Sequence, residues 1–429
     1  MSQPASWLAE YLAIDTSNPP GNESAAVAFL RRILHAEGIS TRVLVSPHGR
    51  PSLYARLDAD PASDDGAIVL QHHMDIVPPG PGWTVDPFTE PPHDGRLWGR
   101  GAIDDKSLGI AHLAAFLDLK RSQSRPKRSV IFLAVADEET GGREGTSWLL
   151  QQHPELFEDV VAVLGEGGLN RAAGDKLLWW GIEVSQKRPL WLKATAWGRG
   201  GHGSMLNLGS APHQLTKALA RLVNRPLDYR VSPPVRQYLE SVAPYQSDFF
   251  GRMVDSLDEI IRRPEPHRDM FPGIPNYLLD TVQVNVIDAG DRINVVPTSA
   301  SAMIDIRLLP DTDQEAFLQD VRDRLGPDIE IEVLLDAPPS APSSTENALY
   351  GCLSEHLPGG APVIPSFIPG ITDSRYFRER NLDAYGFSPF VFDATEAIGV
   401  HGKNEKISFE TFDRGVATMR EVLRACTTD

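Results

Sequence analysis

Short apolar runs alternate with helical stretches over residues 22–165, and this alternation constrains the fold more than any other feature of the chain. Five runs bounded by turns have the length of strands: TRVLVS, SLYARLDA, AIVLQHH, SVIFLAVA and VVAVLG. Apolar residues spaced three and four apart predict helices over 22–37, 106–120 and 144–152. Strands that alternate with helices favour an α/β fold, here a mixed and largely parallel sheet flanked by helices.

The order of elements changes near Ser185. A strand, a helix, two adjacent strands, a second helix and a final strand follow one another, which is typical of a small α+β sandwich. The long connection over 225–275 contains two stretches of helical character, so we expect a helical insertion there. A chain of 429 residues is long enough for two domains. We therefore expect one domain from residues 1–184 and 336–429, interrupted by an inserted domain over 185–335.

Charge and composition exclude several classes of partner. The net charge is −17 and no block of Lys and Arg reverses it locally, so we expect neither nucleic acid nor an anionic membrane as a partner. No apolar run approaches the roughly 20 residues of a membrane span, and the amino-terminal stretch lacks the basic and apolar regions of a signal peptide. Cys352 and Cys426 match no zinc or redox spacing, so we expect free, buried thiols and a reduced, cytoplasmic setting.

Residues that can bind metals recur where the apolar runs or turns end. They are His72, His73 and Asp75 in LQHHMD, Asp104 and Asp105 in GAIDD, Asp137, Glu138 and Glu139 in LAVADEE, and Glu166 in VLGEGG. Each group alone also fits a structural role, such as a helix cap for the GAIDD pair or a solvated loop for the acids of LAVADEE. Because the carboxyl ends of parallel strands form one edge where ligands bind, the recurrence predicts one shared metal site.

The residue types indicate which metals such a site would bind. His73 and Asp75 lie two residues apart and share a face of an extended strand, so the carboxylate could orient an imidazole that binds metal. Imidazole and carboxylates without thiolate suit zinc, or manganese or cobalt, and the number of acids implies two ions. Glu138 and Glu139 should point to opposite sides of an extended segment, which would separate a general base from a metal ligand.

Eight segments, taken in order, resemble the motifs of one family of hydrolases. They are LQHHMDIVPPG, LWGRGAIDDKS, ADEETGG, LGEGG, GRGGHGS, INVVPTSASAMIDIRLLP, GITDSRYF and HGKNEKIS. Over nearly the whole chain the sequence is similar to the aminoacylase, carboxypeptidase G and succinyl-diaminopimelate desuccinylase family of co-catalytic zinc hydrolases. GRGGHG also has the glycine spacing of a dinucleotide site, but no second strand follows within a unit of roughly 30 residues, so this alternative is rejected.

The resemblance implies two Zn²⁺ ions per subunit, which Mn²⁺ or Co²⁺ could replace, and a role for each residue of the first domain. Five residues would bind the metals: His73 and Glu166 one ion, Glu139 and His401 the other, and Asp104 both. Asp75 would orient His73, and Glu138 would be the general base. Relatives also carry a strained peptide after Asp104, so a cis bond is expected there, and Asp105 would cap the following helix.

The same resemblance implies that the inserted domain is a lid that also makes dimer contacts. His202 would contact the developing oxyanion, either from its own subunit or from the partner. Asn294 and Arg307 would contact a substrate carboxylate, which the forked Arg side chain can bind with two parallel hydrogen bonds. Three loop residues would also face the substrate, namely Gly370, Thr372 and Arg375. The insertion over 225–275 is most similar to the carboxypeptidase-S branch.

The expected reaction is hydrolysis of an amide bond in N-acyl amino acids or small peptides with a free carboxylate, by a homodimer. Two alternatives stay open at this point. One is a dipeptidase of the same family, because pocket shape cannot be obtained from motifs. The other is a metal-binding protein without catalysis that serves in sensing or assembly.

Overall fold

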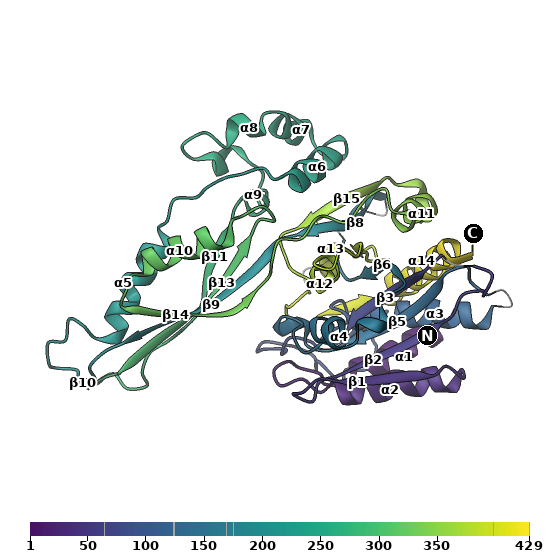
Figure 1. Cartoon of the computed structure of the whole chain (residues 1–429), viewed down its shortest axis with the longest axis horizontal. Helices are drawn as coiled ribbons and strands as arrows, with labels where there is room; N and C mark the ends of the chain where they lie inside the picture. Colours follow the sequence, from purple (N-terminus) through teal and green to yellow (C-terminus); the bar gives the residue numbers. More distant parts are fainter. Residues whose placement is uncertain (64, 123–124, 169, 175, 398, 429) are drawn as a thin grey trace. The chain divides into compact units, whose positions relative to one another are not determined.

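Figure 1 shows a computed structural model of the chain, in which residues 1–63, 65–122, 125–168, 170–174, 176–397 and 399–428 are described. The chain forms two compact units. The first comprises residues 1–184, 341–366 and 372–429, and the second comprises residues 185–340 and 367–371. The chain therefore leaves the first unit after Val184 and returns to it at Ala341, where the sequence pattern had suggested a return at residue 336.

A mixed sheet forms the centre of the first unit, with the strand order β1-β2-β5-β3-β6-β16-β8-β15 and with β7 paired to β8. The strands are β1 Thr41–Val45, β2 Pro51–Leu57, β3 Ala67–His73, β5 Ser129–Val135, β6 Val160–Gly165, β7 Arg171–Ala173, β8 Lys176–Gln186, β15 Val363–Ile368 and β16 Ala384–Gly386. The central pairs β5-β3, β3-β6 and β6-β16 are parallel, whereas β1-β2, β2-β5 and β16-β8 are antiparallel. The predicted fold class is confirmed.

The central strands are apolar on both faces because helices cover both faces. Every residue of β3 and of β5 is buried. Leu70 and Phe132 pack on one side with α1 (Gln3–Leu12), α2 (Glu23–Ala36), α3 (Lys106–Arg121) and α14 (Phe409–Thr428). Val69 and Ile131 pack on the other side with α4 (Thr146–Gln152) and α12 (Ser374–Arg378). Continuous apolar runs are typical of strands that are buried on both sides.

A short antiparallel ribbon joins two distant parts of the first unit. Its strands are β4 (Arg96–Trp98) and β17 (Lys406–Ser408). The turn that carries Asp104 follows β4, and the loop that carries His401 precedes β17. The pairing therefore brings these two loops side by side.

The second unit, in teal and green in Figure 1, is built on an antiparallel sheet with the order β11-β13-β9-β14. The elements are β9 Arg188–Trp197, α5 Ala211–Val223, β11 Thr281–Asp288, β13 Ser299–Leu308, α10 Gln314–Leu325 and β14 Ile329–Asp336. Every second residue of β13 is buried, and these residues form a core with α5 and α10 on one face of the sheet. A separate short antiparallel ribbon pairs β10 (Gly201–His202) with β12 (Val295–Val296).

Short helices fill most of the long connection over residues 225–275. They are α6 Pro233–Val242, η3 Ala243–Tyr245, α7 Asp248–Asp255, α8 Leu257–Ile260, η4 Pro266–Asp269 and, just beyond, α9 Pro275–Leu278. The remaining helices belong to the first unit and are η1 Glu138–Thr140, η2 Pro154–Leu156, α11 Ala348–His356, η5 Pro358–Gly360 and α13 Ala394–Ala397. Among the helices in the described ranges, none combines the length and apolar character that a membrane crossing requires.

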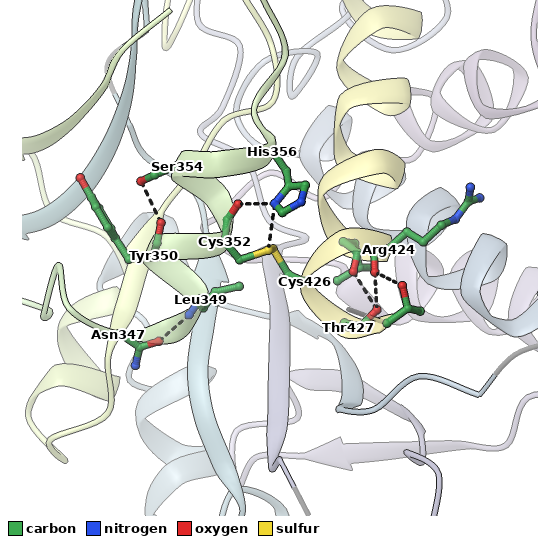
Figure 2. The surroundings of a disulfide bond; sticks show 11 residues. Asn347, Leu349, Tyr350, Cys352, Ser354, His356, Arg424, Cys426 and Thr427 are labelled. Carbon is green, nitrogen blue, oxygen red and sulfur yellow. Dashed lines mark hydrogen bonds between the residues drawn. A yellow bond between two sulfur atoms is a disulfide. The ribbon is translucent and has the colours of Figure 1, made fainter. Parts of the chain in front are cut away.

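The two cysteines form a disulfide, so the prediction of free thiols is wrong. Cys352 lies in α11 and Cys426 in α14, and their Cα atoms are 5.6 Å apart (Figure 2). The packing of these two helices creates the pairing across a sequence separation of 74 residues, which leaves no short-range spacing to detect. Disulfides persist in oxidising compartments. The cysteines therefore no longer support the reduced, cytoplasmic setting that the sequence suggested.

Candidate metal centre

Three neighbouring parallel strands deliver most of the candidate metal ligands. His73 is the last residue of β3, and β5 and β6 flank β3 on either side. Glu138 and Glu139 follow β5, and Glu166 follows β6. Because the three strands run in the same direction, all of these residues lie at one edge of the sheet, as the recurrence of metal-binding residues predicted.

Two groups of possible ligands meet at Asp104. In the first, His73 Nε2 lies 3.0 Å from Asp104 Oδ1 and 3.5 Å from Glu166 Oε2. In the second, His401 Nε2 lies 3.1 Å from Asp104 Oδ2 and 3.3 Å from Glu139 Oε2. Within each group, the candidate ligand atoms lie within 4.8 Å of one another. Each group therefore combines one imidazole with two carboxylates, which is a donor set that fits zinc or a similar divalent ion.

The turn that presents Asp104 needs glycine. Gly101 has φ +90°, and a Cβ at this position would lie 2.9 Å from the Ile76 side chain. The peptide between Asp104 and Asp105 is cis, as the resemblance implied. Asp105 occupies the N-cap position immediately before α3, as predicted, but its side chain makes no capping hydrogen bond. Asp105 is buried, and its Oδ2 has no hydrogen-bond partner among the described residues.

Asp75 holds both His73 and the two glutamates that follow β5. The His73 ring bonds to the backbone oxygen of Asp75 through Nδ1 at 2.8 Å, which leaves Nε2 facing the carboxylates. The nearest Asp75 carboxylate oxygen lies 3.7 Å from the ring. That carboxylate accepts the backbone N–H groups of Glu138 and Glu139, each at 3.1 Å, and the Asn18 amide at 2.8 Å.

Glu138 and Glu139 occupy a 3-10 turn, η1 (Glu138–Thr140), so the predicted extended segment is wrong. The turn starts because Asp137 has φ +73° and because one carboxylate, that of Asp75, binds both following amides. The two side chains are nevertheless engaged differently. Glu139 accepts the Val77 N–H at 3.1 Å and also reaches His401. Desolvation, with the nearby Glu166 charge, raises the pKa of Glu138 well above its ordinary value, which suits a general base.

The electrostatic field of the second group favours positive charge. Hydrogen bonds to the Asp104 and Glu139 carboxylates raise the pKa of His401 to about 10. Carboxylates that stabilise a protonated imidazole would also stabilise a cation, which would bind the neutral imidazole in place of the proton. Both the donor set and the field therefore fit a divalent metal ion.

Comparison with known proteins identifies the family. Residues 69–425 match "Peptidase family M20/M25/M40". The chain belongs to this family. Rat aminoacylase-1B is 28% identical over 416 residues, covering 95% of this chain and 91% of the relative. As an M20 member, the chain is a metal-dependent hydrolase that acts on small molecules or peptides.

Solved structures of M20 proteins share the fold. An M20 metallo-carboxypeptidase from Sulfolobus solfataricus has a TM-score of 0.75 and 18% identity, covering 99% of each chain. The Bacillus subtilis YXEP protein, described as a dinuclear metal-binding peptidase of the M20 family, has a TM-score of 0.58 and 13% identity, covering 99% of this chain and 98% of that chain. At these identities the likeness shows the fold alone.

Three further residues that the M20 motifs pointed to lie in the second unit. His202 is in the β10-β12 ribbon, where its Nδ1 bonds to Ser204 Oγ at 2.8 Å. Asn294 lies beside it, because the Asn294 backbone oxygen accepts the Gly203 N–H at 2.9 Å. Arg307, on β13, makes a forked pair with Asp305 at 2.7 and 3.1 Å. The structure thus brings His202 and Asn294 together and engages the Arg307 fork within its own strand.

The loop over Gly370, Thr372 and Arg375 is divided between the units. Gly370 is exposed and belongs to the second unit, whereas Thr372 and Arg375 are buried in the first. The Arg375 guanidinium donates to the backbone oxygens of Thr372 at 3.0 Å and Gly141 at 2.6 Å. Arg375 therefore supports the turn that follows Glu138 and Glu139.

Sequence reasoning missed several buried polar residues around the centre of this M20 member. Asn18 binds Asp75, as described above. Asp373 accepts the Thr146 hydroxyl at 2.6 Å, and burial raises the pKa of Asp373 to about 7. Glu405 contacts the turn that carries Asp104. Asp373 and Glu405 lie inside the segments GITDSRYF and HGKNEKIS, whereas Asn18 lies outside all eight segments, and polar residues in turns give no signal of burial.

Proposed function

We propose that this M20 member hydrolyses the amide bond of N-acyl amino acids, or of small peptides with a free carboxylate, at a centre of two divalent ions. One observation carries the proposal: the two oxygens of Asp104 face two separate His and Glu groups. A carboxylate in this position is suited to bridge two ions. The similarity to rat aminoacylase-1B over nearly the whole chain supports N-acyl amino acids as the substrate class.

His73, Asp104 and Glu166 would hold one ion, and Asp104, Glu139 and His401 the other. Two Zn²⁺ ions, or Mn²⁺ or Co²⁺, would supply Lewis-acid chemistry, because such ions lower the pKa of water and polarise a carbonyl. Asp75 keeps the His73 ring in the tautomer with Nε2 free and fixes the backbone of both glutamates. The protein contribution is thus a preorganised set of donors.

Glu138 is the residue we assign to proton transfer. Its carboxylate takes a proton from the attacking water and later gives one to the leaving nitrogen. A raised pKa serves both steps, since it makes the carboxylate a stronger base and keeps its acid form available near neutral pH. Glu139, its neighbour, is committed to Val77 and His401 and is left to bind metal.

Substrate contacts are assigned to the second unit. His202 would donate to the developing oxyanion, and Asn294, which lies next to the β10-β12 ribbon, would contact the substrate carboxylate. Arg307 would bind the same substrate carboxylate after its guanidinium releases the Asp305 carboxylate. Thr372 and Gly370 would line the same substrate, with Arg375 holding the loop.

We also propose that the second unit is a lid through which two copies associate. Its edge strand β11 exposes Val286 and Ile287. The β10-β12 ribbon and the loops around it expose a further set of large apolar side chains, namely Met205, Leu206, Leu208, Ile293 and Val295. An unpaired strand edge next to exposed apolar side chains is suited to self-association.

The test is a hydrolysis screen with metal content measured on the same sample. The substrates are N-acyl amino acids and dipeptides in both chiral forms, each with a matched amide that lacks the free carboxylate. We expect two ions per chain, loss of activity with a chelator and its return with Zn²⁺, Mn²⁺ or Co²⁺. Preference for dipeptides would replace the aminoacylase assignment with a dipeptidase. Full activity in a metal-free sample, or equal activity on the amides, would contradict the proposal.

A further inference from the structure

Glu405 is a fully buried carboxylate that lies four residues after His401. Its Oε1 accepts the backbone N–H groups of Ile103 at 2.7 Å and Asp104 at 3.2 Å. Its Oε2 accepts the Gly101 N–H at 3.1 Å and the Arg100 guanidinium at 2.6 Å. One side chain therefore binds four donors from the turn that presents Asp104.

The backbone around Glu405 adds two more links to the same turn. The Gly99 N–H donates to the Glu405 backbone oxygen at 3.0 Å. Arg100 Nη2 donates to the Gly402 oxygen at 2.6 Å. The β4-β17 ribbon then continues the connection. Hydrogen bonds and strand pairing thus hold the turn over 99–104 against the loop over 401–405.

A carboxylate is the side chain that this arrangement requires. It has two oxygens and no donor, so it can accept several N–H groups at once. A buried carboxylate is costly unless its partners are in place, and here they are backbone amides whose positions depend on the turn itself. The contacts therefore make one conformation of the turn much more favourable than others.

We propose that Glu405 is a positioning residue that sets the separation of Asp104 from His401, and so determines the affinity of the ion held by Asp104, Glu139 and His401. This inference rests on the proposed two-ion centre. The other group is less dependent on Glu405, because His73 and Glu166 are placed by β3 and β6. Loss of the Glu405 contacts should therefore lower the binding affinity for the two ions unequally.

The variants are Glu405→Gln and Glu405→Ala. Gln keeps one acceptor oxygen but turns the other position into a donor that faces the Gly101 N–H or Arg100. Asp280→Asn is the matched control, since Asp280 is also a buried carboxylate that accepts a backbone N–H, from Leu309 at 2.6 Å, and binds Arg230 at 2.7 Å. Asp280 lies in the second unit, and among the described residues its carboxylate bonds to Arg230, Leu309 and Thr312, which lie outside the metal-ligand segments.

The measurement is a Zn²⁺ titration against a competing chelator, with the absorption spectrum of the Co²⁺ form and circular dichroism as a check of folding. For Glu405→Ala we expect the ion held by Asp104, Glu139 and His401 to lose about 10- to 100-fold in affinity and the other ion less than about 3-fold, with a smaller loss for Glu405→Gln. Asp280→Asn should keep both affinities. If Glu405→Ala does not fold, Glu405→Gln carries the test.

The outcomes separate this inference from the proposed function. If the unmodified protein does not bind two ions, the two-ion centre itself is wrong. If the unmodified protein binds two ions and the folded Glu405 variants bind both as tightly, the positioning role is wrong. Two further results would overturn the positioning role, because each indicates general destabilisation. One is an equal loss of affinity for both ions in the Glu405 variants, and the other is the same selective loss of affinity in Asp280→Asn.

Discussion

His401 Nε2 lies 3.1 Å from one carboxylate oxygen of Asp104. The other oxygen of Asp104 faces His73, so Asp104 belongs to both ligand groups and His401 to one. We therefore expect His401→Ala to bind one ion per chain and Asp104→Ala to bind neither tightly. Elemental analysis after dialysis checks both. His213, exposed on α5, is the control, and His213→Ala should keep two ions. Retention of two tight ions by His401→Ala would contradict the shared-carboxylate arrangement.

Glu138→Gln should separate catalysis from metal binding. The amide keeps the size of the side chain but cannot take a proton, so we expect kcat to fall by about 10²- to 10⁴-fold. Glu139→Gln is the matched comparison and should lower the metal content as well, since Glu139 faces His401. Steady-state kinetics and metal analysis on the same samples distinguish the two variants. Substantial activity in a metal-loaded Glu138→Gln sample would remove Glu138 from the mechanism.

Asp373 should make the metal-free protein less stable as the pH rises. Burial raises its pKa from 3.8 to about 7, so the folded state holds a proton that the unfolded state releases over this range. The stability gained from the neutral carboxyl is complete below about pH 4 and is lost as the pH approaches 7. The amide of the Asp373→Asn variant stays neutral at every pH. The difference in melting temperature between this variant and the unmodified protein should therefore shift in favour of the variant from pH 4 to pH 7. Parallel melting curves across this range would show that Asp373 does not titrate there.

Reduction of the Cys352–Cys426 disulfide should destabilise the first unit. A disulfide limits the unfolded chain, and loss of a native one typically costs about 2–5 kcal/mol. We expect a dithiol reductant to lower the melting temperature of the unmodified protein by several degrees. The Cys352→Ser/Cys426→Ser double variant should melt at the lower temperature with or without reductant. If the double variant melts at the same temperature as the oxidised protein, the disulfide contributes nothing to the stability of the folded state.

Charged substitutions in the exposed apolar loops of the second unit should prevent self-association. Ile293 and Leu206 are among the most exposed large apolar side chains, at 106% and 87%. We expect Ile293→Asp with Leu206→Asp to convert a dimer into a monomer in sedimentation velocity. Val223→Asp, at an exposed apolar residue on α5, is the control and should leave the dimer intact. An unmodified protein that sediments as a monomer would contradict the proposed association.

Much of the sheet and of one edge of the site could be predicted from the sequence. The runs that became β3, β5 and β6 are continuous and apolar, and their ends carry His73, Glu138, Glu139 and Glu166. An apolar run followed by a residue that can bind metal is a local sequence pattern. Because the carboxyl ends of parallel strands lie at one edge of the sheet, this pattern predicts which residues lie close together. The helices α2, α3 and α4 were predicted by their spacing for the same reason.

The residues that close the site could not be predicted from local patterns. His401 was identified only by resemblance, because a loop histidine beyond a helix has no periodicity to place it. Glu405 and the disulfide partners depend on contacts between distant segments, namely the β4-β17 ribbon and the packing of α11 on α14. The turn at Glu138 and Glu139 differed from the extended form expected, because the carboxylate of Asp75, in the segment that follows β3, binds both backbone N–H groups.

The ribbon between β4 and β17 also has a consequence for how the protein is made on the ribosome. Synthesis runs from the amino terminus, so Asp104 emerges long before the segment that carries His401 and Glu405. The face of α3 that α14 covers stays without its partner for the same interval. In the proposed centre, the ion held by Asp104, Glu139 and His401 would lack its imidazole ligand until His401 is translated, which would make the loading of this ion a late event in maturation.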